Sequence, residues 1–124
     1  MFVDEFQLSV AALTSEVALV SITGELDVHT SSRLREGVDE AASTGAKAVI
    51  VDLSGVSLID STALGVLVQQ AKSLEGRSGL LLVVTNDPRT MRVFELTGLD
   101  RVLRIYPALP DALGVTLPAE GRLA

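Results

Sequence analysis

The chain has 124 residues, a formal net charge of −6 and 48% hydrophobic residues, which suits one domain with its own core. The acidic balance argues against nucleic-acid binding, because that binding depends on lysine and arginine side chains that neutralise phosphates. The absence of cysteine excludes disulfides and zinc–thiolate sites, and the single histidine, His29, excludes a histidine-rich metal site.

The first part of the chain predicts two paired strands and a helix. Residues 2–10 alternate between apolar and polar side chains, and residues 17–22 form a second, β-branched strand. The short connection between them favours antiparallel pairing. The segment GELD at residues 24–27 ends the second strand, and Asp27 or Thr30 caps the following helix. The buried stripe of this helix is predicted at Leu34, Val38, Ala41 and Ala42.

Two glycines bear on this first helix. Gly37 lies inside it and weakens it by about 1 kcal/mol relative to alanine. Gly45 stands where a left-handed C-terminal cap is expected.

A buried strand and a helix follow at the centre of the chain. The apolar run at residues 48–51 predicts a fully buried strand over residues 48–53, which Ser54 and Gly55 then break. The next helix is predicted from Asp60 to about Glu75. Its inward positions are Ala63, Leu64, Leu67, Val68, Ala71 and Leu74. Its outer side is predicted to carry Thr62, Val66, Gln69 and Ser73, an uncharged face that suits a transient interface.

The last part of the chain alternates strands and helices again. Residues 80–84 form an apolar strand, and Asp87 with Pro88 begins a helix that ends at Gly98. Residues 102–105 form a short strand. In the helix before it, we expect Met91, Phe94 and Leu96 to face inward. A final helix is predicted at residues 109–117, where Pro118 stops it.

This order of elements predicts an α/β fold. We expect a mixed, mostly parallel sheet of about five strands with about four helices, in which an antiparallel first strand lies beside four parallel ones. Residues 1–117 are predicted to form a single domain and residues 118–124 a flexible C-terminal tail.

Ligands and partners gather at the carboxyl ends of parallel strands. The loops at residues 24–30 and 54–61 are predicted to lie side by side at that edge. They bring together Asp27, His29, Asp60, Ser61 and Thr62.

Three kinds of chemistry fit this set of side chains. A hydrolase would use Ser61 as nucleophile, His29 as base and Asp27 or Asp60 as orienting carboxylate, but Ser61 lacks the G-x-S-x-G elbow. A phosphate or nucleotide site at the helix N-terminus lacks a phosphate-binding glycine motif, and Asp60 would repel the anion.

The third possibility is a phosphorylation switch. A phosphate on Ser61 adds about −1.5 to −2 charges beside Asp60 and changes the local field sharply. The alternative is that residues 60–62 simply cap the helix.

Three motifs resemble the STAS-domain anti-sigma factor antagonists. The first is VDLSGV at residues 51–56 followed by IDSTALG at residues 59–65, the second is GELD at residues 24–27, and the third is VFELTGL at residues 93–99. The family often has serine at the position of Thr62 and glycine at that of Ala63.

The resemblance implies a STAS-like βα superhelix and a regulatory, non-enzymatic role in bacterial transcription. It implies a partner that is both an anti-sigma factor and a serine kinase, so that binding releases a sigma factor. The kinase would phosphorylate Ser61, with Thr62 as the alternative hydroxyl, and a PP2C-type phosphatase would reverse the step. The partner-binding residues are predicted to be Asp27, His29, Asp60, Thr62, Val66 and Gln69.

A rival hypothesis is a STAS module that senses or scaffolds, binding a small ligand or nucleotide within a signalling or transport assembly. No cofactor or metal is expected. The acidic N-terminus MFVDEFQL differs from a signal peptide, and no apolar run approaches the ~20 residues that span a bilayer. The predicted location is therefore the cytoplasm, without membrane contact.

Overall fold

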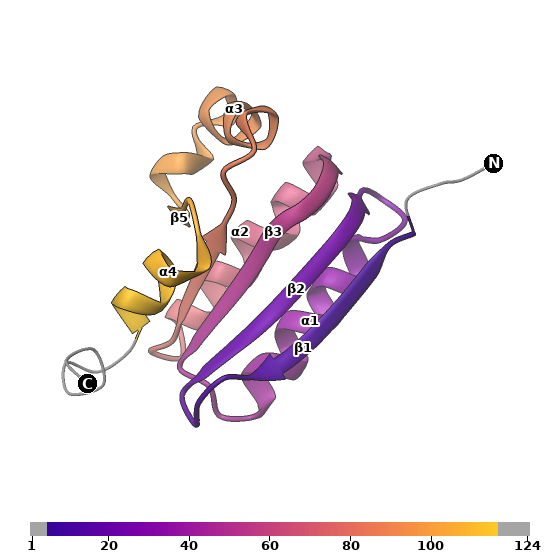
Figure 1. The fold of residues 1–124 in the computed structure, drawn as a ribbon. Helices are drawn as coiled ribbons and strands as arrows, with labels where there is room; N and C mark the ends of the chain where they lie inside the picture. Colours follow the sequence, from indigo (N-terminus) through magenta and orange to yellow (C-terminus); the bar gives the residue numbers. More distant parts are fainter. Residues whose placement is uncertain (1–4, 117–124) are drawn as a thin grey trace.

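The structure is a computed structural model that describes residues 5–116, and its five-stranded sheet carries helices on both faces (Figure 1). The elements are β1 (Gln7–Ala12), β2 (Val17–Leu26), α1 (Ser31–Ser43), β3 (Ala48–Ile59), α2 (Ser61–Glu75), β4 (Leu80–Val84), α3 (Pro88–Thr97), the 3-10 helix η1 (Leu99–Arg101), β5 (Arg104–Tyr106) and α4 (Leu109–Thr116). The predicted α/β class is confirmed. The predicted tail, residues 118–124, lies outside the described residues, as do residues 2–4 of the first predicted strand. No helix in the described span is long and apolar enough to cross a membrane.

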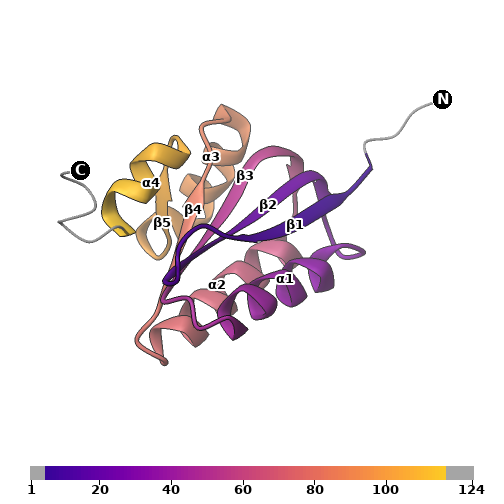
Figure 2. The same ribbon diagram turned by 60° about the horizontal axis from the view of Figure 1, so that its bottom comes forward.

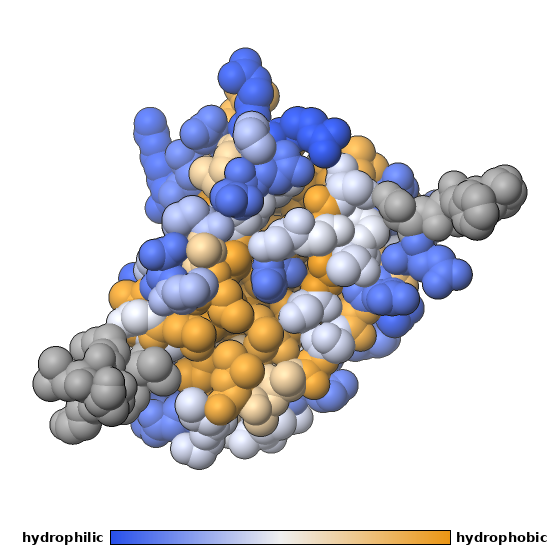
Figure 3. All heavy atoms as spheres, viewed as in Figure 1, coloured by the Kyte–Doolittle hydropathy of each residue, from blue (hydrophilic) through white to orange (hydrophobic). Residues whose placement is uncertain are grey.

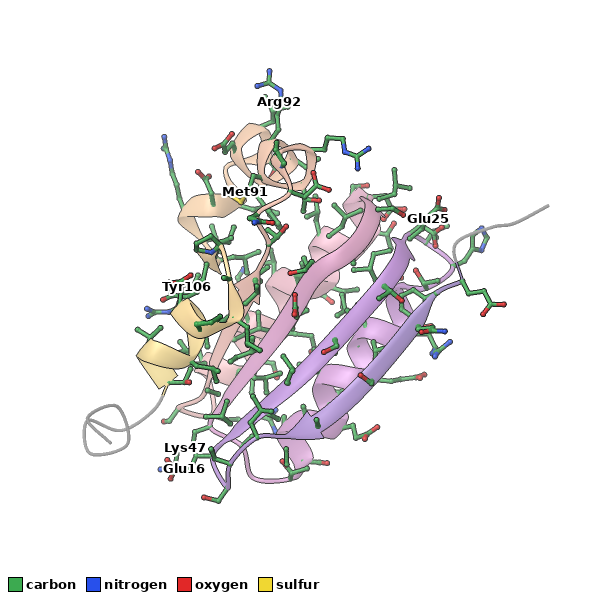
Figure 4. The ribbon with its side chains drawn as sticks, in the orientation of Figure 1. Glu16, Glu25, Lys47, Met91, Arg92 and Tyr106 are labelled. Atoms are coloured by element: carbon green, nitrogen blue, oxygen red, sulfur yellow. The ribbon has the colours of Figure 1, made fainter. Side chains whose placement is uncertain are left out.

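The sheet has the predicted mixed topology, in the order β1-β2-β3-β4-β5. β1 pairs antiparallel with β2, and all other neighbours are parallel. The carboxyl ends of the parallel strands therefore lie together at one end of the sheet, near Glu25 in Figure 4. Glu16 and Lys47 lie at the opposite end of the sheet, where Lys47 Nζ is 3.9 Å from Glu16 Oε1 (Figure 4).

Two apolar cores lie on the two faces of the sheet. α1 and α2 lie side by side on one face, where Val51 and Leu67 belong to the larger core (Figure 2). α4 packs on the other face, where Ile50 joins a smaller core that also contains Leu82 and Ala112. Apolar residues gather around α4 on this face (Figure 3). Because successive residues of β3 face opposite cores, the strand is apolar without alternation.

β3 is longer than the sequence predicted. Ser54 and Gly55 do not break it, and the strand continues to Ile59. Its pairing with β2 shifts register twice, so that irregularities interrupt the ladder without ending it. A Cβ built on Gly55 would lie 2.7 Å from Thr23 Cγ2, so this glycine lets β2 pass closely. The extension carries the chain to Asp60, beside the end of β2.

Packing explains one of the helical glycines and overturns one expectation. Gly37 has a steric role, because a Cβ there would lie 2.8 Å from Leu8 Cδ2 where α1 crosses β1. Phe94 of α3 is fully buried as predicted, but the expectation for Leu96 is wrong, because this side chain is 72% exposed. Two residues correspond to about 200° around a helix, so Leu96 points away from the core that Phe94 enters.

Candidate functional site

The loops after β2 and β3 lie against each other at the carboxyl ends of the parallel strands. Leu26 pairs with Ile59 in the final register of these strands. The amide of Asp60 then donates a hydrogen bond to the carbonyl of Leu26 at 3.0 Å. This contact places the beginning of α2 next to the loop that contains Asp27 and His29.

Ser61 is the first residue of α2 and is exposed to solvent. Asp60 is the N-cap, and its Oδ1 accepts a hydrogen bond from the amide of Ala63 at 3.0 Å. Within residues 5–116 the hydroxyl of Ser61 makes no hydrogen bond. Thr62 is also exposed. Asp60 therefore caps the helix while the Ser61 hydroxyl remains accessible, so capping and modification do not compete for the same side chain.

Asp27 holds its own loop together. Its Oδ1 accepts hydrogen bonds from the amides of His29 at 2.9 Å and Thr30 at 3.1 Å. The Thr30 hydroxyl accepts from the amide of Asp27 at 2.9 Å and donates to the carbonyl of Glu25 at 2.8 Å. Thr30 is thus the residue before α1, but its side chain binds the loop and does not cap the helix.

These contacts also shift the pKa of Asp27. Desolvation is the largest single influence and would raise the pKa. The amides of His29 and Thr30, the Thr30 hydroxyl and the charge of His29 together outweigh it, so that the pKa lies below the ordinary 3.8. The carboxylate form is therefore the one that the loop favours.

The hydrolase arrangement finds no support in this geometry. His29 is exposed, and its backbone amide, not its ring, meets the carboxylate of Asp27. Among the described residues no hydrogen bond joins Ser61 to His29. No group of three or more histidine, aspartate or glutamate side chains with metal-binding geometry occurs within residues 5–116 either.

An open apolar groove begins at Ser61, and the sequence did not predict it. It lies between the first half of α2 and the end of α3, with a volume of about 350 Å³. We call it the α2–α3 groove, and its lining residues are Ser61, Leu64, Gly65, Val68, Thr97 and Leu99. The exposed hydroxyl of Ser61 therefore lies at the border of this apolar surface.

Gly65 forms part of the groove surface. A Cβ built on it would meet nothing within 4 Å, so packing inside the chain does not require a glycine there. A glycine inside an exposed helix nevertheless costs about 1 kcal/mol relative to alanine. The one sequence signal here is a glycine in the middle of a predicted helix, and the open space around it is known only from the structure.

A smaller hollow lies next to the groove. It has a volume of about 160 Å³, between the end of β3 and the beginning of α3. Leu58 in its wall is 50% exposed, and Arg89 at its rim donates to the carboxylate of Asp87 at 3.5 Å. Arg92, on the same helix, points away from the sheet (Figure 4).

The predicted outer face of α2 is partly wrong. Val66 is only 3% exposed. Gln70, one turn further on, is also buried, and its Nε2 donates to Asp39 Oδ1 at 2.9 Å and to the carbonyl of Arg35 at 3.2 Å. Because α1 packs beside α2, this flank faces a neighbouring helix instead of solvent. Gln69 is exposed, as predicted, and its Oε1 accepts from Arg35 Nη2 at 3.1 Å.

On the groove side of α2, a residue predicted to be buried is partly exposed. Val68 was predicted to face inward, but it is half-buried and lines the groove. Together, Val66 and Val68 show that the buried stripe of α2 is rotated toward α1 relative to the prediction.

Comparison with known proteins gives a consistent result. The STAS-domain family model matches residues 10–112. The anti-sigma-F factor antagonist RsfB of Mycobacterium tuberculosis is 35% identical over 97 residues, which cover 78% of this chain and 79% of that protein. The anti-sigma-B factor antagonist of Listeria monocytogenes is 34% identical over 86 residues, which cover 69% of this chain and 75% of that protein.

A solved structure agrees with these relatives. An anti-sigma factor antagonist from Mycobacterium paratuberculosis matches with a TM-score of 0.81 at 31% identity, over 90% of this chain and 94% of that chain. The chain belongs to the STAS-domain family, and the resemblance seen in the sequence motifs is confirmed.

Proposed function

We propose that this STAS-domain chain is an anti-sigma factor antagonist, a non-enzymatic regulator that binds an anti-sigma factor and thereby releases a sigma factor. The relatives named as anti-sigma factor antagonists support this role. The observation that carries it here is the exposed hydroxyl of Ser61, free of hydrogen bonds within the described chain, at the border of the α2–α3 groove.

The α2–α3 groove is the proposed centre of the partner interface. Apolar surface in its walls provides the area that a transient complex buries. A polar rim completes the proposed interface. At the carboxyl ends of the strands it consists of the half-buried Asp27 and Asp60 and the exposed His29 and Thr62, and further along α2 it includes the exposed Gln69. Val66 is removed from the predicted interface because it is buried, and the exposed Gly65 and the half-buried Val68 take its place.

Phosphorylation of Ser61 is the proposed off-switch. The phosphate would lie at the N-terminus of α2, where the helix dipole accommodates negative charge, so the fold itself tolerates the group. It would also lie beside the Asp60 carboxylate and at the mouth of the groove. An apolar or acidic partner surface in contact with Ser61 is then repelled, and binding is lost while the protein remains folded.

The partners proposed for this cycle are an anti-sigma factor with serine kinase activity and a PP2C-type phosphatase. Nucleic acid and membranes have no role in it, no cofactor or metal is needed, and the cytoplasm is the compartment in which it takes place.

Substitutions at Ser61 test the proposal against the cognate anti-sigma factor. We expect Ser61→Ala to bind like the native chain in titration calorimetry. We expect Ser61→Asp to bind at least about tenfold more weakly, because like charges 4 Å apart repel by about 1 kcal/mol in water and about 4 kcal/mol at an effective dielectric of 20.

Ser73→Asp is the matched control, because it adds the same charge to an exposed position of the same helix outside the groove lining, and it should bind like the native chain. Incubation with the kinase and ATP, followed by mass spectrometry, should place the phosphate on Ser61 in the native chain and in Thr62→Ala. Equal affinities of the native chain, Ser61→Ala and Ser61→Asp would contradict the switch. A saturable rise in melting temperature with a nucleotide, together with no binding of the anti-sigma factor, would favour the ligand-sensing alternative.

A further inference from the structure

The two edges of the sheet are protected very differently. β5 forms one edge and has three residues, begins with the exposed Arg104 and is followed closely by α4. β1 forms the other edge and is six residues long. It is the outermost strand in both ribbon views, and within residues 5–116 no other element lies beside its free edge (Figures 1 and 2). Every second residue of such a strand turns its N–H and C=O away from the sheet.

β1 lacks the features that usually prevent an edge strand from pairing. Charged side chains, proline and bulges are the common protections. Residues 6–15 contain no charged residue and no proline. The register between β1 and β2 runs without a shift from Gln7 opposite Thr23 to Ala12 opposite Ala18, so no bulge twists the edge away.

Contacts with α1 also hold β1 in place. The close approach of Gly37 to Leu8 packs α1 directly against β1. The guanidinium carbon of Arg33 lies 5.2 Å from the ring centroid of Phe6, just before the strand begins. An edge that is already ordered loses little conformational entropy when it pairs.

We propose that β1 pairs antiparallel with β1 of a second copy of this chain, which joins the two sheets into one. Antiparallel pairing of identical strands about a two-fold axis is self-complementary, so each outward N–H meets an outward C=O of the other copy. Each copy carries a net charge of −6, and an uncharged edge is where two such chains can meet without apposing like charges.

This pairing leaves the proposed Ser61 site free. α1 packs on β1 and on α2, whereas the α2–α3 groove lies on the side of α2 that faces α3. A dimer through β1 therefore leaves both α2–α3 grooves exposed, whatever partner binds them.

Sedimentation velocity over about 10 µM to about 1 mM tests the proposal. The native chain should form a concentration-dependent dimer. The double variant Ser9→Lys/Ala11→Lys places like charges on exposed positions across the two-fold axis, and its dimer dissociation constant should rise at least about tenfold. Added lysines reduce the net negative charge, so general repulsion predicts the opposite change.

A charge-matched control is Ser54→Lys/Ser73→Lys, at exposed positions on β3 and α2. This control should dimerise like the native chain. Mixing Ser9→Lys/Ala11→Lys with Ser9→Glu/Ala11→Glu should restore a heterodimer, which also shows that both variants are folded. A native chain that stays monomeric over the whole range, a dimer unaffected by the edge lysines, or no rescue on mixing would overturn the proposal.

Discussion

Asp27 illustrates how a residue in a family motif acts through its neighbours. It was predicted as a helix cap or as a contact for a partner, and its contact with a partner stays a prediction. In the structure its carboxylate accepts hydrogen bonds from two backbone amides and so holds the loop that adjoins Asp60. The sequence predicted that Asp27 or Thr30 caps α1, but which oxygen accepts from which amide depends on the backbone path after β2.

The lowered pKa of Asp27 makes a testable contribution to stability. Because the folded pKa lies below 3.8, the ionised form stabilises the fold above that pH, and the stabilisation is lost as the pH falls through the folded value. We expect Asp27→Asn to be less stable than the native chain at neutral pH, with a difference that shrinks under acid conditions. Urea unfolding between about pH 6 and about pH 2.5 measures this difference.

Thr30 supplies the control for this measurement. Thr30→Val removes the hydroxyl that contacts the Asp27 carboxylate and should reduce the acid-dependent difference, whereas Thr30→Ser should preserve it. Unfolding free energies of the native chain and Asp27→Asn that run parallel through the whole acid range would show that the carboxylate does not hold the loop.

At the scale of elements, α2 shows why periodicity alone misplaces a face. The helical repeat correctly identified Leu64, Leu67 and Leu74 as buried. Val66 and Val68 lie on opposite flanks of that stripe and are equally apolar, so the sequence does not distinguish them. The side on which α1 packs buries Val66, and the side that faces α3 leaves Val68 in the groove.

Gly65 gives α2 a prediction in which stability and binding change in opposite directions. Gly65→Ala should raise the unfolding free energy by up to about 1 kcal/mol, because alanine favours helix and nothing lies near the new methyl group. The same methyl should weaken binding of the anti-sigma factor, since an added group in a packed interface typically costs about 1–3 kcal/mol. Urea unfolding and titration calorimetry measure the two effects.

Gly114 is the matched control in α4. It also lies in a helix with open space around a built Cβ, and it is not among the groove residues. Gly114→Ala should stabilise the chain without changing its affinity. If Gly65→Ala binds as tightly as the native chain, the α2–α3 groove is not the interface.

Gly24 of β2 lies close to the backbone just before β1, a contact that the GELD motif does not reveal. It has a φ of +95°, and a Cβ on it would lie 2.9 Å from both Glu5 O and Phe6 Cα. Gly45 has a similar φ of +91° with nothing within 4 Å. Gly45→Ala should cost about 1 kcal/mol of left-handed backbone strain, and Gly24→Ala at least about 1 kcal/mol more, because backbone atoms must also move. Equal losses in urea unfolding would contradict the steric role of Gly24.

At the scale of the whole molecule, the proposed interfaces occupy different sides. The β1 edge and α1 lie on one side, and the α2–α3 groove with Ser61 lies on the other. A chain with net charge −6 can therefore dimerise along an uncharged edge while a phosphate at Ser61 regulates the distant groove. Loss of partner binding on phosphorylation should accordingly leave the dimer intact.

The sequence by itself determined the order of strands and helices, the antiparallel first strand and the place of Ser61 at the start of a helix. These features follow from local patterns, namely alternation, apolar runs and capping residues. The tertiary structure decided the full length of β3, the exposure of Leu96, the burial of Val66 and the existence of the groove. Each of these depends on which neighbour packs against an element, and residues distant in the sequence supply that neighbour.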